Sequence, residues 1–169
     1  MGFYIYKENN ITLSINSSSI KIGNSVKLTP TVKDLTDNIP ITSGTVEYYL
    51  SNGTKIGSSA PDGSFVYTPS KTGNYTFYAK YIPDENSNIY LECTSNNVDL
   101  EVVPLNTVVS ADKVVNKTNS IMDIPVSVVD EFGVSVANGT VKSTIDGTEY
   151  SATVNDGKAI FKDVKLLGK

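Results

Sequence analysis

The 169-residue chain contains no arginine, histidine, glutamine or tryptophan. Without histidine it lacks the commonest general base and metal ligand of proteins, so hydrolysis by a nucleophile–histidine pair is not expected. All 14 basic residues are lysines, against 18 acidic residues, and neither residues 1–103 nor residues 104–169 carry an excess of lysine. Because nucleic-acid binding needs a basic patch, we exclude that function. We predict a protein that is not an enzyme and has no cofactor or metal.

Cysteine and long apolar runs are also scarce. Cys93 is the single cysteine, which excludes a disulfide within the chain. No basic residue stands beside it in the sequence to activate the thiol, so we interpret Cys93 as a small, partly buried apolar residue. No stretch approaches the ~20 apolar residues that cross a bilayer. We therefore expect no direct membrane insertion in this segment.

Apolar and polar residues alternate along most of the chain, which is the pattern of half-buried β-strands. The alternation is clear in residues 26–33, 46–51, 75–81 and 98–102. Between such runs stand Asn-Gly and Asp-Gly pairs, which tolerate the positive φ angles of tight turns. No run has the spacing of a helix. The sequence therefore predicts an all-β sandwich or barrel.

Three short motifs recur about 95 residues later in the same order. They are Val32-Lys33-Asp34 with Val128-Val129-Asp130, Gly44-Thr45-Val46 with Gly139-Thr140-Val141, and Asp62-Gly63 with Asp156-Gly157, at offsets of 96, 95 and 94. The period is close to the ~100 residues of an immunoglobulin-like sandwich. We predict two such domains, residues 1–103 with a core over 11–103 and residues 104–169. Pro104 marks the boundary because proline cannot donate to a strand ladder.

The same register leaves the second copy incomplete. Gly73, which precedes a strand in the first copy, corresponds to Gly168. The second copy would then lack the equivalents of strands F and G, which lie beside strand C in one sheet of the immunoglobulin arrangement. A single strand would have to cover the other sheet, leaving apolar surface wet and edges unpaired. We expect either a fragment of a longer repeat protein or a neighbour that supplies the missing strands.

The motifs resemble the bacterial-type immunoglobulin-like repeats of microbial surface proteins. In the first copy the resemblance rests on Gly44-Thr45-Val46-Glu47-Tyr48 and Gly73-Asn74-Tyr75-Thr76, in an order that covers nearly all of residues 11–103. In the second copy Asn138-Gly139-Thr140-Val141 is similar to adhesin-like proteins of methanogenic archaea. The resemblance implies an extracellular, cell-surface location and neighbouring repeats of the same chain as partners.

Two tyrosines are candidates for a ligand-stacking surface, and a third, which is expected to point inward, is a candidate for a structural role. Tyr49 and Tyr78 are expected to face outward on neighbouring strands, where they could stack on a sugar ring or pack against each other across the sheet. Tyr75 follows the turn at Gly73, and resembles a tyrosine corner, whose hydroxyl bonds the backbone between strands E and F. Its expected role is structural.

The sequence contains candidate glycosylation sites. Six Asn-x-Ser/Thr sequons occur at Asn10, Asn16, Asn52, Asn74, Asn116 and Asn138, about twice the ~3 that composition predicts. Asn10, Asn16, Asn52 and Asn138 are interpreted as turn or loop residues.

Two acidic clusters contain oxygen atoms that could bind calcium. One consists of Asp34, Asp37 and Asn38, and the other of Asp84, Glu85 and Asn86. Both lack the spacing of a calcium-binding loop, so solvated turns are favoured.

Three functions remain open from the sequence. The first is a non-enzymatic adhesin or stalk module, made of tandem immunoglobulin-like repeats, that mediates adhesion or spaces a distal binding tip from the cell. The second is a carbohydrate- or protein-binding module that uses exposed tyrosines or loops, with an unknown surface protein or glycan as partner. The third is an accessory domain of a surface enzyme.

Overall fold

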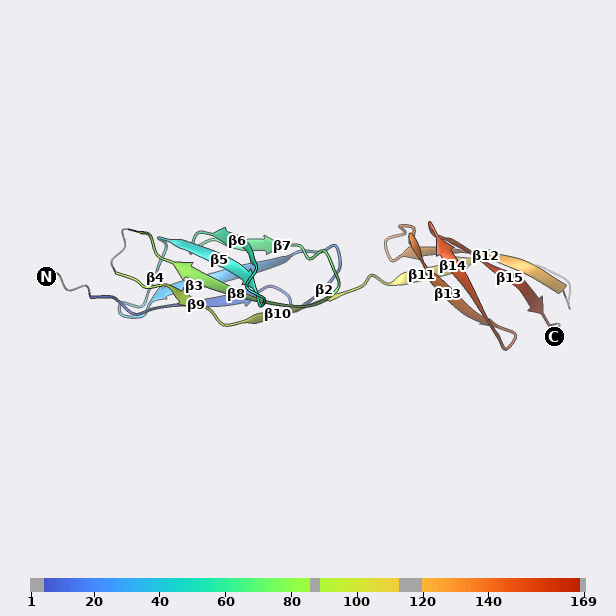
Figure 1. The fold of residues 1–169 in the computed structure, drawn as a ribbon, viewed down its shortest axis with the longest axis horizontal. Helices are drawn as coiled ribbons and strands as arrows, with labels where there is room; N and C mark the ends of the chain where they lie inside the picture. The colour runs from blue at the N-terminus through green and yellow to red at the C-terminus, as the bar shows by residue number, and fades with distance from the viewer. Residues whose placement is uncertain (1–4, 86–88, 113–119, 168–169) are drawn as a thin grey trace. The chain divides into compact units, whose positions relative to one another are not determined.

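The computed structural model describes residues 5–85, 89–112 and 120–167 (Figure 1). This part of the chain contains strands, turns and loops but no helix, so the predicted all-β class is confirmed. It correspondingly offers no helix long and apolar enough to cross a membrane. The chain divides into two compact units, Met1–Pro104 and Leu105–Lys169, called unit 1 and unit 2 below.

The first sheet of unit 1 is organised around β3 (Val26–Asp34). Strands β1 (Asn9–Ile15), β4 (Ile39–Pro40) and β7 (Phe65–Tyr67) all pair with β3 in antiparallel fashion. The nine residues of β3 alternate strictly between buried and exposed, because successive side chains of a strand point to opposite faces. The inward register predicted for this strand is therefore confirmed.

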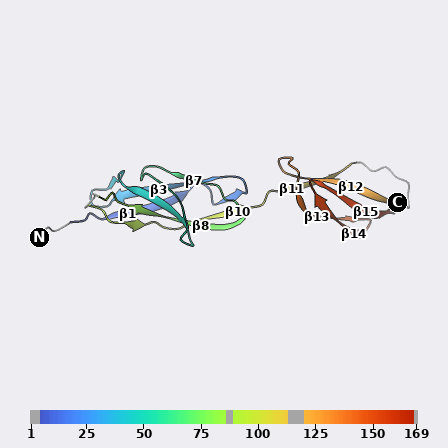
Figure 2. The same ribbon diagram turned by 45° about the horizontal axis from the view of Figure 1, so that its top comes forward.

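The second sheet of unit 1 contains six strands. Its order is β2 (Ser19–Lys21), β10 (Val98–Val103), β8 (Gly73–Ile82), β5 (Thr45–Leu50) and β6 (Lys55–Ser59), and β9 (Cys93–Thr94) also pairs with β8. The pairing of β2 with β10 is parallel, and the others are antiparallel. The two sheets form an immunoglobulin-like β-sandwich, which Figure 2 shows from a second direction.

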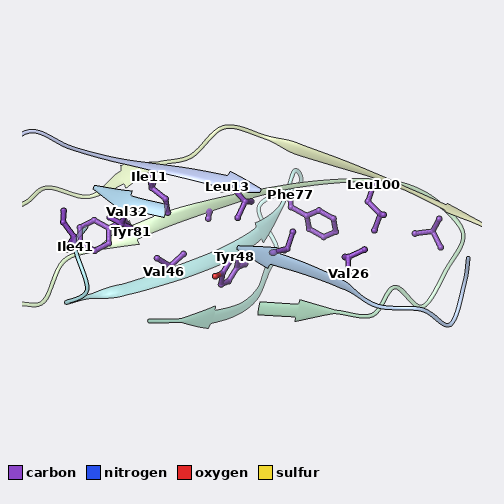
Figure 3. Packing of buried hydrophobic residues seen from close by; sticks show 13 residues of the cluster. Ile11, Leu13, Val26, Val32, Ile41, Val46, Tyr48, Phe77, Tyr81 and Leu100 are labelled. Atoms are coloured by element: carbon purple, nitrogen blue, oxygen red, sulfur yellow. The ribbon is translucent and has the colours of Figure 1, made fainter. Parts of the chain in front are cut away.

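Thirteen buried apolar residues fill the space between the sheets of unit 1 (Figure 3). Tyr48, Phe77 and Tyr81 are the largest and are fully buried. Burying a phenolic hydroxyl costs free energy unless it is hydrogen-bonded. The hydroxyls of both buried tyrosines have a hydrogen-bond partner. The Tyr48 hydroxyl lies 2.8 Å from the Ser59 hydroxyl, and the Tyr81 hydroxyl donates to the Ser43 carbonyl oxygen at 3.1 Å.

Gly44, the residue before β5, can only be a glycine. Its φ angle is +92°, and a Cβ atom there would lie 2.6 Å from the Ile82 carbonyl oxygen and 2.8 Å from the Tyr81 ring. Both contacting residues belong to β8, which pairs with β5 along the whole length of β5. Close packing of β8 against the start of β5 therefore explains this glycine.

The described part of unit 2 has a single five-stranded sheet. Its order is β11 (Thr107–Ala111), β12 (Ser120–Asp130), β15 (Lys158–Leu166), β14 (Thr148–Asn155) and β13 (Asn138–Ile145). Strand β12 pairs with β11 on one side and with β15 on the other. Strands β13 and β14 form a hairpin that is paired over eight residues, but β14 meets β15 only at Asn155 and Lys158.

The hairpin differs from the sequence-based expectation of one strand covering the other sheet. In Figure 1 it runs obliquely to β12 and β15. Val141 of β13 and Val154 of β14 are thereby buried with Ile124, Val126 and Phe161 in a second core. The turn at Asp146-Gly147, with φ angles of 47° and 81°, makes the hairpin possible by reversing the chain directly after β13.

Candidate functional site

The outer face of β5 and β8 carries the two tyrosines proposed from the sequence. Tyr49 and Tyr78 are direct partners in the register of these strands, and both are half-buried. Their ring centroids lie 5.3 Å apart with an interplanar angle of 11°, so the rings stack on each other. The structure thus brings the pair together, with a ring face of each used in the mutual contact.

Charged side chains surround the tyrosine pair. Glu47 accepts hydrogen bonds from the Tyr49 hydroxyl and from the Lys55 ammonium, and the Lys80 Nζ lies 5.7 Å from the centroid of the Tyr49 ring. The bond to Glu47 is the main cause that raises the pKa of Tyr49 to about 12. The bond from Lys55 is the main cause that lowers the pKa of the Glu47 carboxyl.

We call this set, Glu47, Tyr49, Lys55, Tyr78 and Lys80, the β5–β8 face. Lys80 also pairs with Glu92, at 3.7 Å. The cluster is internally hydrogen-bonded and neutralised, and it contains no nucleophile with an adjacent base. Chemically it can offer aromatic edges and charges to a ligand and can stabilise the sheet by cross-strand packing.

The described sequon asparagines, Asn10, Asn16, Asn52, Asn74 and Asn138, are all exposed. Asn16 follows β1 and Asn52 lies in a turn, as predicted. The interpretation of Asn10 and Asn138 as turn residues is wrong, because the first lies inside β1 and the second begins β13. Asn116 lies outside the described residues. Exposure on an outward strand face gives a strand asparagine the same access to solvent as a loop asparagine.

Asp34 is a buried carboxylate bound by the protein itself. One of its oxygens accepts the amides of Thr36 and Asp37 at 2.8 and 3.0 Å, and the other accepts the Tyr90 hydroxyl at 2.8 Å. The Lys7 ammonium lies 3.3 Å away. Burial alone would raise the pKa of Asp34, but these donors together hold it below its usual value.

These donors occupy both carboxylate oxygens of Asp34, the buried member of the first acidic cluster. In the second cluster, Asp84 and Glu85 are exposed, and Asn86 lies outside the described residues. Throughout the described ranges, no three His, Cys, Asp or Glu side chains come together in an arrangement that could hold a metal ion.

Two structural interpretations of single residues agree with the contacts. The Tyr75 hydroxyl donates to the Lys71 carbonyl oxygen at 2.9 Å, which confirms the predicted tyrosine corner. Cys93 is partly buried, and its sulfur accepts the Asn9 side-chain amide at 3.1 Å. Burial is the main cause that raises the pKa of the Cys93 thiol, so the thiolate is disfavoured.

Asn96 has a role that the sequence did not indicate. Its side chain accepts the Leu13 amide at 2.9 Å and donates to the Leu13 carbonyl oxygen at 3.0 Å. It thereby pairs with both backbone groups of Leu13, as a neighbouring strand would. Because 83 residues separate the two positions, no local pattern could have revealed the contact.

No known protein family's sequence profile matches the chain, and no curated protein matches it. Among solved structures, it is similar to the CARDB domain of PF1109 from Pyrococcus furiosus, at 19% identity and a TM-score of 0.41, covering 62% of this chain and 99% of that one. It is also similar to the fibronectin(III)-like modules of Clostridium thermocellum CbhA, at 17% identity and a TM-score of 0.43, covering 90% of this chain and 80% of that one.

A third similar structure is the Yersinia pseudotuberculosis adhesin InvE, at 17% identity and a TM-score of 0.39. That similarity covers 91% of this chain and 51% of the adhesin.

Proposed function

We propose that the chain serves as a non-enzymatic cell-surface adhesin or stalk module, built from two immunoglobulin-like units in tandem. The second unit has strands corresponding to β1, β3, β5, β6 and β7 of the first, and no described counterpart of β8 or β10. In such an array each unit supports its neighbours along one dimension, which allows a binding tip to be held away from the cell.

The repeated arrangement of the two units carries the proposal. Strand β12 lies between β11 and β15, as β3 lies between β1 and β7. Leu28 pairs with Phe65 in unit 1, and Ile124 pairs with Phe161 in unit 2, with both residues of the pair displaced by 96 positions. A shared offset in a long-range pair supports one architecture used twice.

The ends of β3 and β12 repeat the same local chemistry. Asp34 ends β3, and its carboxylate accepts the amides of the residues two and three positions later. Asp130 ends β12, and its carboxylate accepts the amides of Phe132 and Val134 at 2.9 Å each. An aspartate that caps the following turn in this way stabilises the chain reversal after each strand.

Antibody labelling of the cells that make the protein tests the surface assignment. Antibodies raised against the purified chain should label intact cells, and mild protease treatment of intact cells should remove the signal. Labelling that requires permeabilised cells would refute a surface role. Beads coated with the chain should also adhere to their target surface more than beads coated with a denatured preparation.

Carbohydrate or protein binding through the β5–β8 face is a second candidate, because the structure stacks Tyr49 and Tyr78 on an outward face. The partner would be a glycan or surface protein that contacts the aromatic edges. A glycan array with the wild-type chain, Tyr49→Ala and Tyr78→Ala tests it, with exposed Tyr6→Ala as the matched control. Binding that survives both substitutions on the face would exclude this candidate.

We also propose that the exposed sequons carry glycans. Asn16 and Asn52 use their side-chain oxygens to accept the amides of Lys27 and Thr54, at 2.7 and 3.0 Å. A glycan is attached to the side-chain nitrogen, so these bonds are compatible with modification. Mass spectrometry of the native protein is the test, and bare asparagine at every sequon would refute the proposal.

A further inference from the structure

The outward face of β8 carries both a sequon and one of the stacked tyrosines. Phe77, Ala79 and Tyr81 are the buried residues of this strand. Because successive side chains of a strand point to opposite faces, Asn74 and Tyr78 both point outward. Four residues of extended strand separate them, which is a distance of about 13 Å. The nitrogen to which a glycan is attached and the tyrosine pair therefore lie on one surface.

A groove lies beside the sequon asparagine. Its volume is about 390 Å³, and its lining includes Ser18, Asn74, Thr76, Asp99 and Glu101. Asp99 and Glu101 belong to β10, where they stand opposite Thr76 and Asn74 in the strand register. Ligand sites usually have volumes of ~300–1,000 Å³. The groove therefore has room for a sugar ring next to the attachment nitrogen.

The side chains of the groove suit the hydroxyl groups of a neutral sugar. The carboxylates of Asp99 and Glu101 are both exposed. One Asp99 oxygen accepts the Thr76 hydroxyl at 2.6 Å, and an ionised carboxylate has further acceptor positions on its two oxygens. Sugar hydroxyls can donate to these positions. An acidic sugar would be repelled by the two carboxylates, so the groove favours an uncharged one.

Beyond Thr76 the same surface leads to Tyr78. The Tyr49 ring stacks on Tyr78 from the β5 side of the sheet. The opposite ring face of Tyr78 is turned toward the β10 side, where the residue level with it is Asn97. Asn97 is exposed and has no bulky side chain. One aromatic face of Tyr78 is thus available to a flat apolar surface such as that of a sugar ring.

We propose that a neutral glycan attached to Asn74 folds back along β8. Its first sugar lies in the groove beside Asp99 and Glu101, and its next sugar stacks on the face of Tyr78 that Tyr49 does not cover. Because the glycan is tethered, its effective concentration at the groove is in the millimolar range, so a few weak contacts suffice to hold it. This placement rests on the proposed glycosylation of the exposed sequons.

The attachment changes one bond of the Asn74 side chain. The side-chain nitrogen bonds to the anomeric carbon of a sugar carried on a diphosphate donor, the bond from that carbon to the diphosphate oxygen breaks, and the amide proton goes to the diphosphate. A glycan placed along β8 would cover Tyr78 and keep other glycans away from it. The β5–β8 face would then be occupied by the chain's own sugar, which favours the stalk role over carbohydrate capture.

A double-mutant cycle in the complete chain tests the contact. The chain is secreted from a eukaryotic host that attaches neutral oligomannose glycans, and mass spectrometry measures the occupancy of Asn74. Asn74→Gln should lower the melting temperature of unit 1 by about 2–8 °C, as expected for one aromatic contact. The same substitution should have almost no effect in Tyr78→Ala, and its full effect in Tyr78→Phe. Tyr6→Ala, at an exposed tyrosine of the same unit, is the matched control and should leave the effect unchanged.

Hydroxyl-radical footprinting gives a local measurement. Oxidation of Tyr78 should be at least about twofold slower in the glycosylated chain than in Asn74→Gln, because one ring face is covered, whereas Tyr6 should react equally in both. In chain made by bacteria without N-glycosylation, Asn74→Gln should change neither quantity.

Three results would each overturn the placement of the glycan. They are an equal cost of Asn74→Gln with and without the Tyr78 ring, unchanged oxidation of Tyr78, and a bare Asn74 in a host that occupies the other sequons. Bare asparagine at every sequon of the native protein is a different result, because it would refute the proposed glycosylation itself.

Discussion

Replacing Phe77 by alanine should remove a large part of the stability of unit 1. Phe77 is fully buried in β8, where it stands opposite Leu50 of β5 and Val98 of β10. Its ring meets Tyr67 edge to face at 5.3 Å and lies parallel to Tyr75 at 6.3 Å. The substitution therefore leaves a cavity between two sheets and also ends two aromatic contacts.

The expected cost of Phe77→Ala is about 3–5 kcal/mol, the usual range for truncating a buried phenylalanine. A unit of about 100 residues has a total stability of roughly 5–15 kcal/mol, so the variant should remain folded with a much smaller margin. With a urea m-value of about 1–3 kcal/mol/M, the midpoint should fall by at least about 1 M.

Tyrosine fluorescence can follow unit 1 almost by itself. Nine of the ten tyrosines belong to unit 1, Tyr150 is the exception, and there is no tryptophan to mask them. Urea unfolding of the complete chain should thus report the loss at Phe77 directly. The matched control is Val66→Ala in β7 of the same unit, a valine that is 59% exposed, which should change stability by less than about 0.5 kcal/mol. A loss below about 1.5 kcal/mol for Phe77→Ala would refute the assigned core.

Three further predictions concern single hydroxyl, carboxyl and thiol groups. Tyr75→Phe should destabilise unit 1 by about 1 kcal/mol, because it removes the bond to Lys71; urea unfolding measures it, and no change would exclude a structural tyrosine corner. The pKa of Tyr49, raised to about 12, should appear as a late phenolate transition in ultraviolet titration. The pKa of Tyr49 is higher in the folded chain than in the unfolded chain. The hydrogen bond from Tyr49 to Glu47 therefore stabilises the fold fully below about pH 10, and this stabilisation is lost as the pH rises toward about 12. Glu47→Gln should bring the Tyr49 transition to lower pH, and an unmoved transition would contradict the assigned hydrogen bond. Cys93 should react with a thiol reagent at mildly alkaline pH more slowly than free cysteine, and equal rates would contradict its burial.

The strand pattern of unit 1 could be predicted from the sequence because it depends on local alternation. The inward positions of β3, including Val26, Leu28 and Val32, were identified in this way. The pairing of Tyr49 with Tyr78 also followed, since both stand at outward positions of strands expected to be neighbours. Such features need only the period of two and a fold class.

Contacts between distant residues could not be predicted in the same way. The donors that surround Asp34 include Tyr90, and the Asn96 side chain reaches Leu13, across 56 and 83 residues. The packing of the hairpin in unit 2 could not be predicted either, because Asp146-Gly147 marks a tight turn but residues 148–155 alternate like any half-buried strand and do not indicate which strands they cover. Sequence alternation gives the face of a strand and not its neighbour.

The sequence by itself determined that this is an all-β protein with a motif repeated about 95 residues apart, since alternation and turn residues act over a few neighbouring positions. Only the tertiary structure decided how the strands pair, which carboxylates are satisfied by the protein, and that Asn74 shares a groove with Asp99 and Glu101. The physical reason is that burial and backbone pairing are properties of strands brought together by the whole chain, whereas the side-chain period is a property of each strand alone.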